Sequence, residues 1–122
     1  MRAFRPFEIE AIRLMAANVL SPAHLELLAQ IQAPSRYEYT GSGYYLAVSH
    51  PSLPDDRCTL CEPAVIGTAG DVRAGFVVFL AEKELTLECH TWGAVDGPED
   101  FRDRSVEIST PPVHVVDLRN AT

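Results

Sequence analysis

The sequence predicts an α+β fold, in which an N-terminal helical hairpin packs on an antiparallel sheet of four to six strands. Between residues 7 and 31, apolar residues recur every three or four positions, which is the period of an amphipathic helix. From Ser35 onward the period changes to two, as in a strand with one buried face. Short turns separate the strands, so neighbouring strands should run antiparallel, and the 122 residues fit a single domain over 1–122.

Two helices are expected before the change of period. Pro6 opens the first, over residues 7–19, because proline is tolerated in the first turn of a helix. Ser21 as N-cap and Pro22 at the first helical position begin the second, over residues 22–31. A tight corner joins the two helices, so we expect an αα-hairpin whose apolar stripes pack on a sheet.

Several short strands should follow the helices. Residues 36–40 alternate tyrosines with charged side chains, residues 44–50 are expected to form another strand, and the glycine-rich stretch 41–43 forms the turn between them. Residues 51–63 contain three prolines and are expected to form a loop. A further short strand is predicted at 64–67.

A β-hairpin over residues 75–93 organises the predicted sheet. Its first arm, 75–81, is an almost continuous apolar run, which predicts a central strand with both faces covered. Glu82, Lys83 and Glu84 are expected to form the turn. The second arm alternates between two rows of side chains. The buried row is Leu85, Leu87, Cys89 and Thr91, and the solvent-facing row is Thr86, Glu88, His90 and Trp92.

The remaining C-terminal part is less regular. A helical turn is predicted to start at Pro98, and residues 105–109 alternate as a strand does. Residues 110–122 fit either a final edge strand or a mobile tail, and the sequence leaves both open.

The net charge of the chain indicates which kinds of macromolecule it can bind. The net charge of −7 disfavours nonspecific binding to nucleic acid or to an anionic membrane, and it suits a basic protein. Glu8, Glu10 and Arg13 interrupt the apolar residues near the N-terminus, so neither a signal peptide nor a membrane span is expected there. We therefore expect a cytoplasmic protein, and the odd number of cysteines, three, argues against a disulfide scaffold.

Cys58 and Cys61 form the one motif with known metal chemistry. Two thiols at this spacing can chelate zinc, but a closed site needs four ligands and no second such pair is present. Neighbouring acids also oppose thiolate formation. We therefore predict no metal and no cofactor, and keep as the alternative a metal-binding or small-molecule-handling domain that uses the 58–61 loop, with ligands completed by His50, Cys89, His90 or His114.

No catalytic residues are predicted. The glycines at 41–43 are followed by strand residues, so they match neither a Walker loop nor a dinucleotide-binding loop. The four histidines lie far apart in sequence. A pair such as Cys89 with His50 is compatible with nucleophilic chemistry, but no pattern specifies it.

Exposed aromatic residues beside acids indicate a protein-binding surface. Tyrosine and tryptophan are enriched at protein interfaces and at their energetic hot spots. The alternative is that some of these rings cover the sheet where the helices pack. The predicted partner-binding set is Tyr37, Glu38, Tyr39, Tyr45, Glu88, His90 and Trp92, and either Tyr44 or Tyr45 should share the face of Tyr37.

Three stretches carry a resemblance to known proteins: EYTGSGYY at residues 38–45, GFVVF at 75–79 and LTLEC at 85–89. Over about two-thirds of its length the chain resembles small bacterial α+β proteins of uncharacterised families, some of them similar to immunity proteins that neutralise toxins such as contact-dependent inhibition nucleases. The resemblance implies a single-domain cytoplasmic protein that acts by binding a basic toxin, without catalysis. It brings no catalytic residues, and the 58–61 loop has no counterpart in it.

Overall fold

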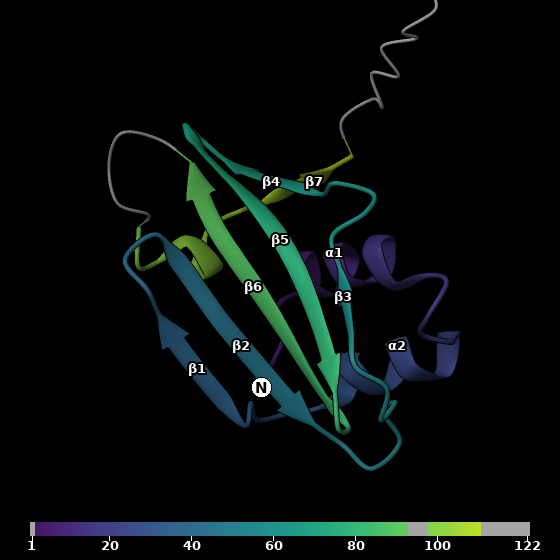
Figure 1. Cartoon of the computed structure of the whole chain (residues 1–122). Helices are drawn as coiled ribbons and strands as arrows, with labels where there is room; N and C mark the ends of the chain where they lie inside the picture. The colour runs from purple at the N-terminus through teal and green to yellow at the C-terminus, as the bar shows by residue number, and fades with distance from the viewer. Residues whose placement is uncertain (1, 93–97, 111–122) are drawn as a thin grey trace, which may run out of the picture.

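The α+β class is confirmed. The computed structural model describes residues 2–92 and 98–110, with two N-terminal helices on one face of an antiparallel sheet (Figure 1). Six strands follow one another in the order β1-β2-β6-β5-β4-β7, and β3 adds a seventh by pairing with β5. The elements are α1 (Pro6–Ala16), α2 (Pro22–Gln30), β1 (Arg36–Tyr39), β2 (Gly43–Ser49), β3 (Cys58–Leu60), β4 (Ile66–Ala69), β5 (Val72–Ala81), β6 (Glu84–Trp92), the 3-10 turn η1 (Phe101–Asp103) and β7 (Glu107–Ser109).

Local signals place the helices, with one correction at the end of α1. Ser21 caps α2 as expected, since its hydroxyl accepts a hydrogen bond from the backbone N–H of His24 at 3.2 Å. The predicted extension of α1 to Val19 is wrong: the helix ends at Ala16, and the Val19 side chain is 41% exposed. Leu20 is buried instead, because the chain turns at this point. Among the described residues, neither helix is long and apolar enough to span a membrane.

The β5–β6 hairpin is the centre of the sheet, as predicted. β5 pairs with β6 from Arg73 to Ala81 and with β4 and β3 on its other side. The predicted three-residue turn is wrong, because Ala81 pairs with Glu84 and only Glu82 and Lys83 lie between the strands. Both turn residues have positive φ angles, 50° and 63°, and their N–H groups bond to carbonyls of the preceding loop, those of Asp55 and Pro54. These tertiary hydrogen bonds hold a conformation that non-glycine residues rarely adopt.

The two faces of the sheet have different environments. Alternate residues of β5 and β6 are buried beneath the helices, including Phe76, Val78 and Leu87. The prediction that β5 is covered on both faces is wrong, because Phe79 on the opposite face is 36% exposed. Figure 1 shows both helices behind the sheet, with β2, β6 and β5 in front of them. We call the face turned away from the helices the open face.

Three short strands, β3, β4 and β7, extend the sheet on the side of β5 that faces away from β6. β3 lies within the predicted loop 51–63 and pairs with the end of β5 near the hairpin turn, whereas β4 pairs with its beginning. β7, within the predicted strand 105–109, pairs with β4. The expectation of an edge strand or a mobile tail at 110–122 falls almost wholly on residues outside the described part.

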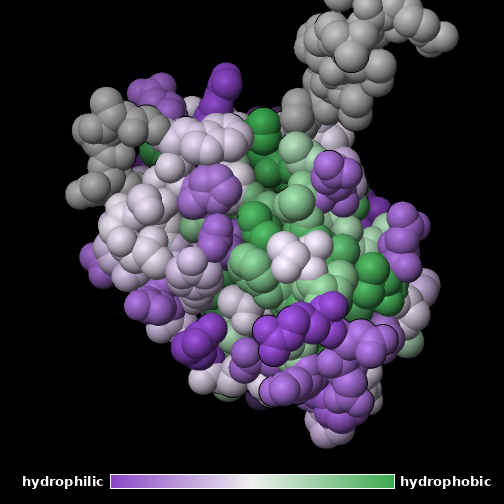
Figure 2. Space-filling model, viewed as in Figure 1, coloured by the Kyte–Doolittle hydropathy of each residue, from purple (hydrophilic) through white to green (hydrophobic). Residues whose placement is uncertain are grey.

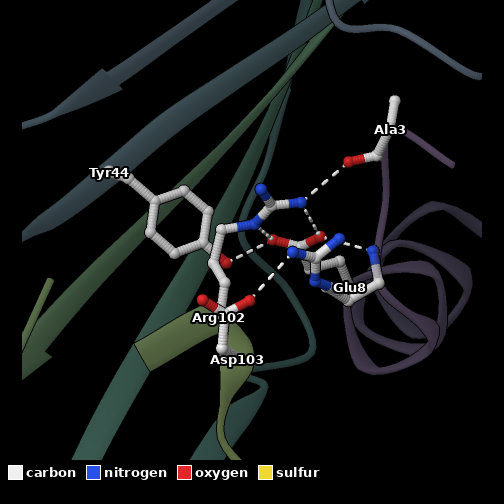
Figure 3. Close-up of polar contacts among 6 residues, drawn as sticks. Ala3, Glu8, Tyr44, Arg102 and Asp103 are labelled. Atoms are coloured by element: carbon white, nitrogen blue, oxygen red, sulfur yellow. Dashed lines mark hydrogen bonds and ion pairs between the residues drawn. The ribbon is translucent and has the colours of Figure 1, made fainter. Parts of the chain in front are cut away.

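One buried ion pair connects the first helix to the segment before β7. Glu8 has no exposed surface, and its carboxylate accepts two hydrogen bonds from the Arg102 guanidinium, at 2.7 and 2.8 Å. Tyr44 donates its hydroxyl to the same carboxylate, and the Arg5 backbone N–H donates at 2.6 Å (Figure 3). Arg102 also donates to the carbonyl of Ala3 at 2.7 Å. These contacts hold α1, β2 and η1 together.

The ionisation states within this cluster support the hydrogen-bond directions. Burial first, and then the charge of Glu8, raise the pKa of Tyr44 far above its usual value, so its phenol stays protonated and donates. Burial alone would lower the pKa of Arg102, but the hydrogen bonds and charge of Glu8 outweigh it and raise that pKa. Arg102 is therefore always a cation facing the buried carboxylate.

Replacing Arg102 should destabilise the fold strongly, because it leaves a buried carboxylate without a partner. We expect Arg102→Met to lower the free energy of unfolding by about 3–5 kcal/mol. Arg104→Met is the matched control, since Arg104 pairs with Asp100 at the surface and such pairs contribute about 0–1 kcal/mol. Urea denaturation followed by circular dichroism measures both. Equal losses for the two variants would contradict the central role of the Glu8–Arg102 pair.

Candidate binding face

The open face carries most of the predicted partner-binding residues in adjacent positions. Strand register aligns Glu38 of β1, Tyr45 of β2, Glu88 of β6 and Val77 of β5 in one row across four strands. Directly opposed residues of neighbouring strands share a face and lie about 5 Å apart. The row therefore combines two acids, a phenol and an aliphatic side chain on one surface.

A second group lies beside this row, where His90 and Trp92 face the start of β5. Their rings are 6.1 Å apart in an edge-to-face arrangement, and Trp92 is 49% exposed. Gly75, directly opposite His90, makes room for the His90 ring, since a Cβ at Gly75 would lie 3.0 Å from Cε1 and Nε2 of His90. We had not predicted a role for Gly75. A glycine in an otherwise apolar strand opposite an aromatic residue was the available signal.

The structure does not bring the whole predicted set together. Glu38, Tyr45, Glu88, His90 and Trp92 lie on the open face, but Tyr37 and Tyr39 point to the opposite side of the sheet. Side chains alternate along a strand, so tyrosines on either side of Glu38 cannot share its face. Tyr44, and not Tyr45, shares the face of Tyr37, and their ring centroids are 5.7 Å apart.

A small cavity opens beside Trp92, between β5, β6 and the loop after β3. We call it the Trp92 cavity. Its volume is about 210 Å³, below the 300–1,000 Å³ typical of small-molecule sites, so it suits one side chain better than a whole ligand. Figure 2 shows hydrophobic surface over β5 and the strands beside it, bordered by hydrophilic residues. The cavity is lined mainly by apolar groups, among them Val65, Ile66, Gly75, Val77, His90 and Trp92.

Glu88 lies opposite Val77, which lines this cavity, and it interacts with Tyr45 on the row and with His90 on β6. A side-chain hydrogen bond with Glu88, and then the charge of that carboxylate, raise the pKa of Tyr45. His90 Nδ1 lies 3.7 Å from Glu88 Oε1 and is buried. Within the described part of the chain, this nitrogen has no hydrogen-bond partner. Because the His90 nitrogen is buried, the Glu88 carboxylate is the group that the edge of the cavity offers to an incoming polar group.

The residues of the alternative metal site are spread over the molecule. Cys58 is opposite Leu80 on the helix-facing side, whereas Cys61 is exposed and lines the Trp92 cavity. His50 follows the far end of β2, where its Nδ1 accepts a hydrogen bond from the N–H of Ser52 at 3.0 Å. In the ranges 2–92 and 98–110, no three His, Cys, Asp or Glu side chains are grouped as metal ligands would be. His114 lies outside those ranges.

The buried thiol of Cys89 is poorly suited to nucleophilic or metal chemistry. It is 1% exposed, and burial, followed by the charge of Glu8, raises its pKa to about 12. Cys89 also pairs with Tyr44, near the start of β2, while His50 lies beyond its end, on the order of 20 Å away along the strand. The Cys89–His50 pair considered from the sequence therefore does not form.

The open face brings together residue types that are common at protein interfaces. Aromatic rings, aliphatic side chains and a few acids are adjacent on it, and these residue types provide anchors and orientation at interfaces. Comparisons of the chain with models of protein families, with curated proteins and with solved structures find no match.

The three thiols should differ in reactivity. We expect Cys61 to react with a maleimide within minutes, Cys58 more slowly, and Cys89 only when the protein unfolds, because its thiolate is scarce and inaccessible. Mass spectrometry after labelling in buffer and in denaturant identifies each site. Labelling of Cys89 in the native protein at the rate of Cys61 would contradict the buried position.

We predict that the purified protein contains no stoichiometric zinc. The reason is that Cys58 and Cys61 point to different surroundings and lack two further ligands among the described residues. Elemental analysis of protein purified without chelator measures this. One zinc per chain that disappears in Cys61→Ser would overturn the prediction and support the metal-binding alternative.

Proposed function

We propose that the protein is a noncatalytic binding domain whose open face captures a basic protein partner, in the way that an immunity protein covers the cationic surface of a toxin. The observation that carries the proposal is the exposed Trp92 beside an apolar cavity with Glu88 at its edge. Tryptophan is among the residues most enriched at the energetic hot spots of protein interfaces.

The charge of the chain supports a basic partner. With a net charge of −7, the protein attracts cationic surfaces at long range and speeds their association. On the open face, Glu88 lies in the central strand β6, whereas Glu38 shares the edge strand β1 with Arg36, and Arg73 lies near the start of β5, opposite Trp92. An incoming cation therefore meets the Glu88 carboxylate at the centre of the face.

The Trp92 cavity suggests how one partner side chain is bound. A lysine or arginine has an apolar stem that fits a cavity of about 210 Å³ and a charged end that reaches the cavity edge. There the cation can bond the Glu88 carboxylate, while a second cation can lie over the indole of Trp92, an attraction of about 0.5–2 kcal/mol. A toxin that binds nucleic acid presents such side chains where its substrate phosphates would lie, so an acidic inhibitor competes for that surface.

The test begins with a partner retained from a lysate by the immobilised protein, followed by binding kinetics for variants of the open face. We expect Trp92→Ala to raise the dissociation rate about 30-fold, which corresponds to a hot spot of about 2 kcal/mol. Val19→Ala is the matched control, since Val19 is exposed but lies after α1, away from the open face.

Electrostatic steering is tested separately. We expect Glu88→Lys to slow association at least tenfold more than Glu26→Lys, which makes the same charge change on α2. Raising the salt concentration should weaken binding of the wild type. Affinity that is unchanged by Trp92→Ala, Glu88→Lys and salt would refute binding at the open face.

A further inference from the structure

The outer edge of the sheet at β1 is open for strand pairing. β1 pairs with β2 on one side only, and all of its residues except Tyr39 are exposed. The N–H of Thr40 donates to the carbonyl of Gly43 at 2.9 Å, so at alternate positions Glu38 and Arg36 also direct their peptide groups toward β2. Tyr37 therefore directs its N–H and C=O outward, away from β2.

The side chains of β1 are self-complementary. Arg36 and Glu38 lie two residues apart on the open face, with Tyr37 between them on the other face. If two copies of β1 pair antiparallel with Tyr37 opposite Tyr37 of the second copy, each Arg36 lies opposite a Glu38. A shift of the twofold axis by one residue in either direction places Arg36 opposite Arg36 or Glu38 opposite Glu38. Because like charges directly opposite are destabilising, the charges select the register centred on Tyr37.

Backbone geometry favours the same register. The outward peptide groups of Tyr37 can exchange two N–H···O bonds with those of the second Tyr37. The Arg36–Glu38 pairs then fall at positions where side chains of opposed strands approach most closely. Backbone and side chains thus agree on one arrangement.

The Tyr37 ring is already held in place for such a contact. It is 43% exposed, and the Arg102 guanidinium lies 5.6 Å from its centroid while Tyr44 packs beside it. A side chain that is ordered before association loses less conformational entropy when it is buried. The cluster around Glu8 thereby also orders a residue of the sheet edge.

We propose that β1 pairs antiparallel with β1 of a second copy of this chain, which joins the two sheets into one across a twofold axis. The other outer strands lack this complementarity. β7 carries only Glu107, and β3 (Cys58–Leu60) carries no charged residue. If β7 paired with β7 of a second copy, Glu107 would lie opposite either another Glu107 or an uncharged residue, and no ion pair would form. β1 is therefore the edge that a second copy fits.

The dimer should be weak and reversible. Four residues in each strand bury little surface compared with the 1,200–2,000 Å² of stable complexes. Two chains of net charge −7 also repel each other. At about 0.15 M salt the Debye length is about 8 Å, so this long-range repulsion is largely screened while the opposed pairs stay within reach.

Charge-reversal variants test the proposal by sedimentation velocity at about 0.15 M salt, over protein concentrations from micromolar to millimolar. We expect the wild type to dimerise as concentration rises. Arg36→Glu and Glu38→Arg should each weaken self-association at least tenfold, because each places like charges opposite one another. A mixture of the two variants should form heterodimers, since every opposed pair is then Glu with Arg. The double variant Arg36→Glu/Glu38→Arg should dimerise like the wild type.

Two controls separate this result from general charge or folding effects. Arg57→Glu makes the same charge change in an exposed loop and should leave dimerisation unchanged, and so should Trp92→Ala on the open face. Circular dichroism should show native spectra for all variants. A wild type that stays monomeric up to millimolar concentration, or a dimer that persists in both single charge variants, would overturn the proposal. These outcomes are distinct from partner binding at the open face, which Trp92 reports.

Discussion

A carboxylate in a protein core needs a compensating charge. In this chain the carboxylate is that of Glu8, and the groups that compensate it come from separate parts of the fold and hold those parts together. Desolvating an unpaired charge costs several kcal/mol, so Glu8 is stable in the core only when Arg102 and Tyr44 are in place. The bonds of this one carboxylate unite the first helix, the second strand and the segment before β7. Through Arg102 they extend to Tyr37, at the exposed edge of the sheet.

The helices cover one side of the sheet and leave the other side uncovered. The helix-facing side takes the continuous core, with Phe76, Val78 and Leu87 buried. The open face keeps partly exposed apolar residues such as Phe79 and Trp92, whose burial would be favourable in a complex. The partner-binding proposal concerns this face and the dimer proposal concerns the β1 edge, so a dimer would place two open faces on one side of a continuous sheet.

Much of the fold could be predicted because its signals are local. The Ser21 cap and the alternation along β6 each depend on a few neighbouring residues; the cap was confirmed, and so was the alternation, except that Thr86 of the predicted solvent-facing row is buried. The predictions were wrong where contacts between distant parts of the chain determine the local structure. The turn at Glu82 and Lys83 is held by hydrogen bonds to carbonyls of a distant loop. The apolar run of β5 is compatible with a strand covered on one face or on both, so the sequence does not distinguish the two cases.

The sequence by itself determined the class of fold, the central hairpin and the residue types available for binding, since periodicity and composition are properties of the chain alone. Only the tertiary structure decided which residues meet. It separated Tyr37 and Tyr39 from Trp92, left the candidate metal ligands apart among the described residues, and joined Glu8 to Arg102 across 94 positions. Contacts over such separations depend on strand order and register, which side-chain periodicity does not encode.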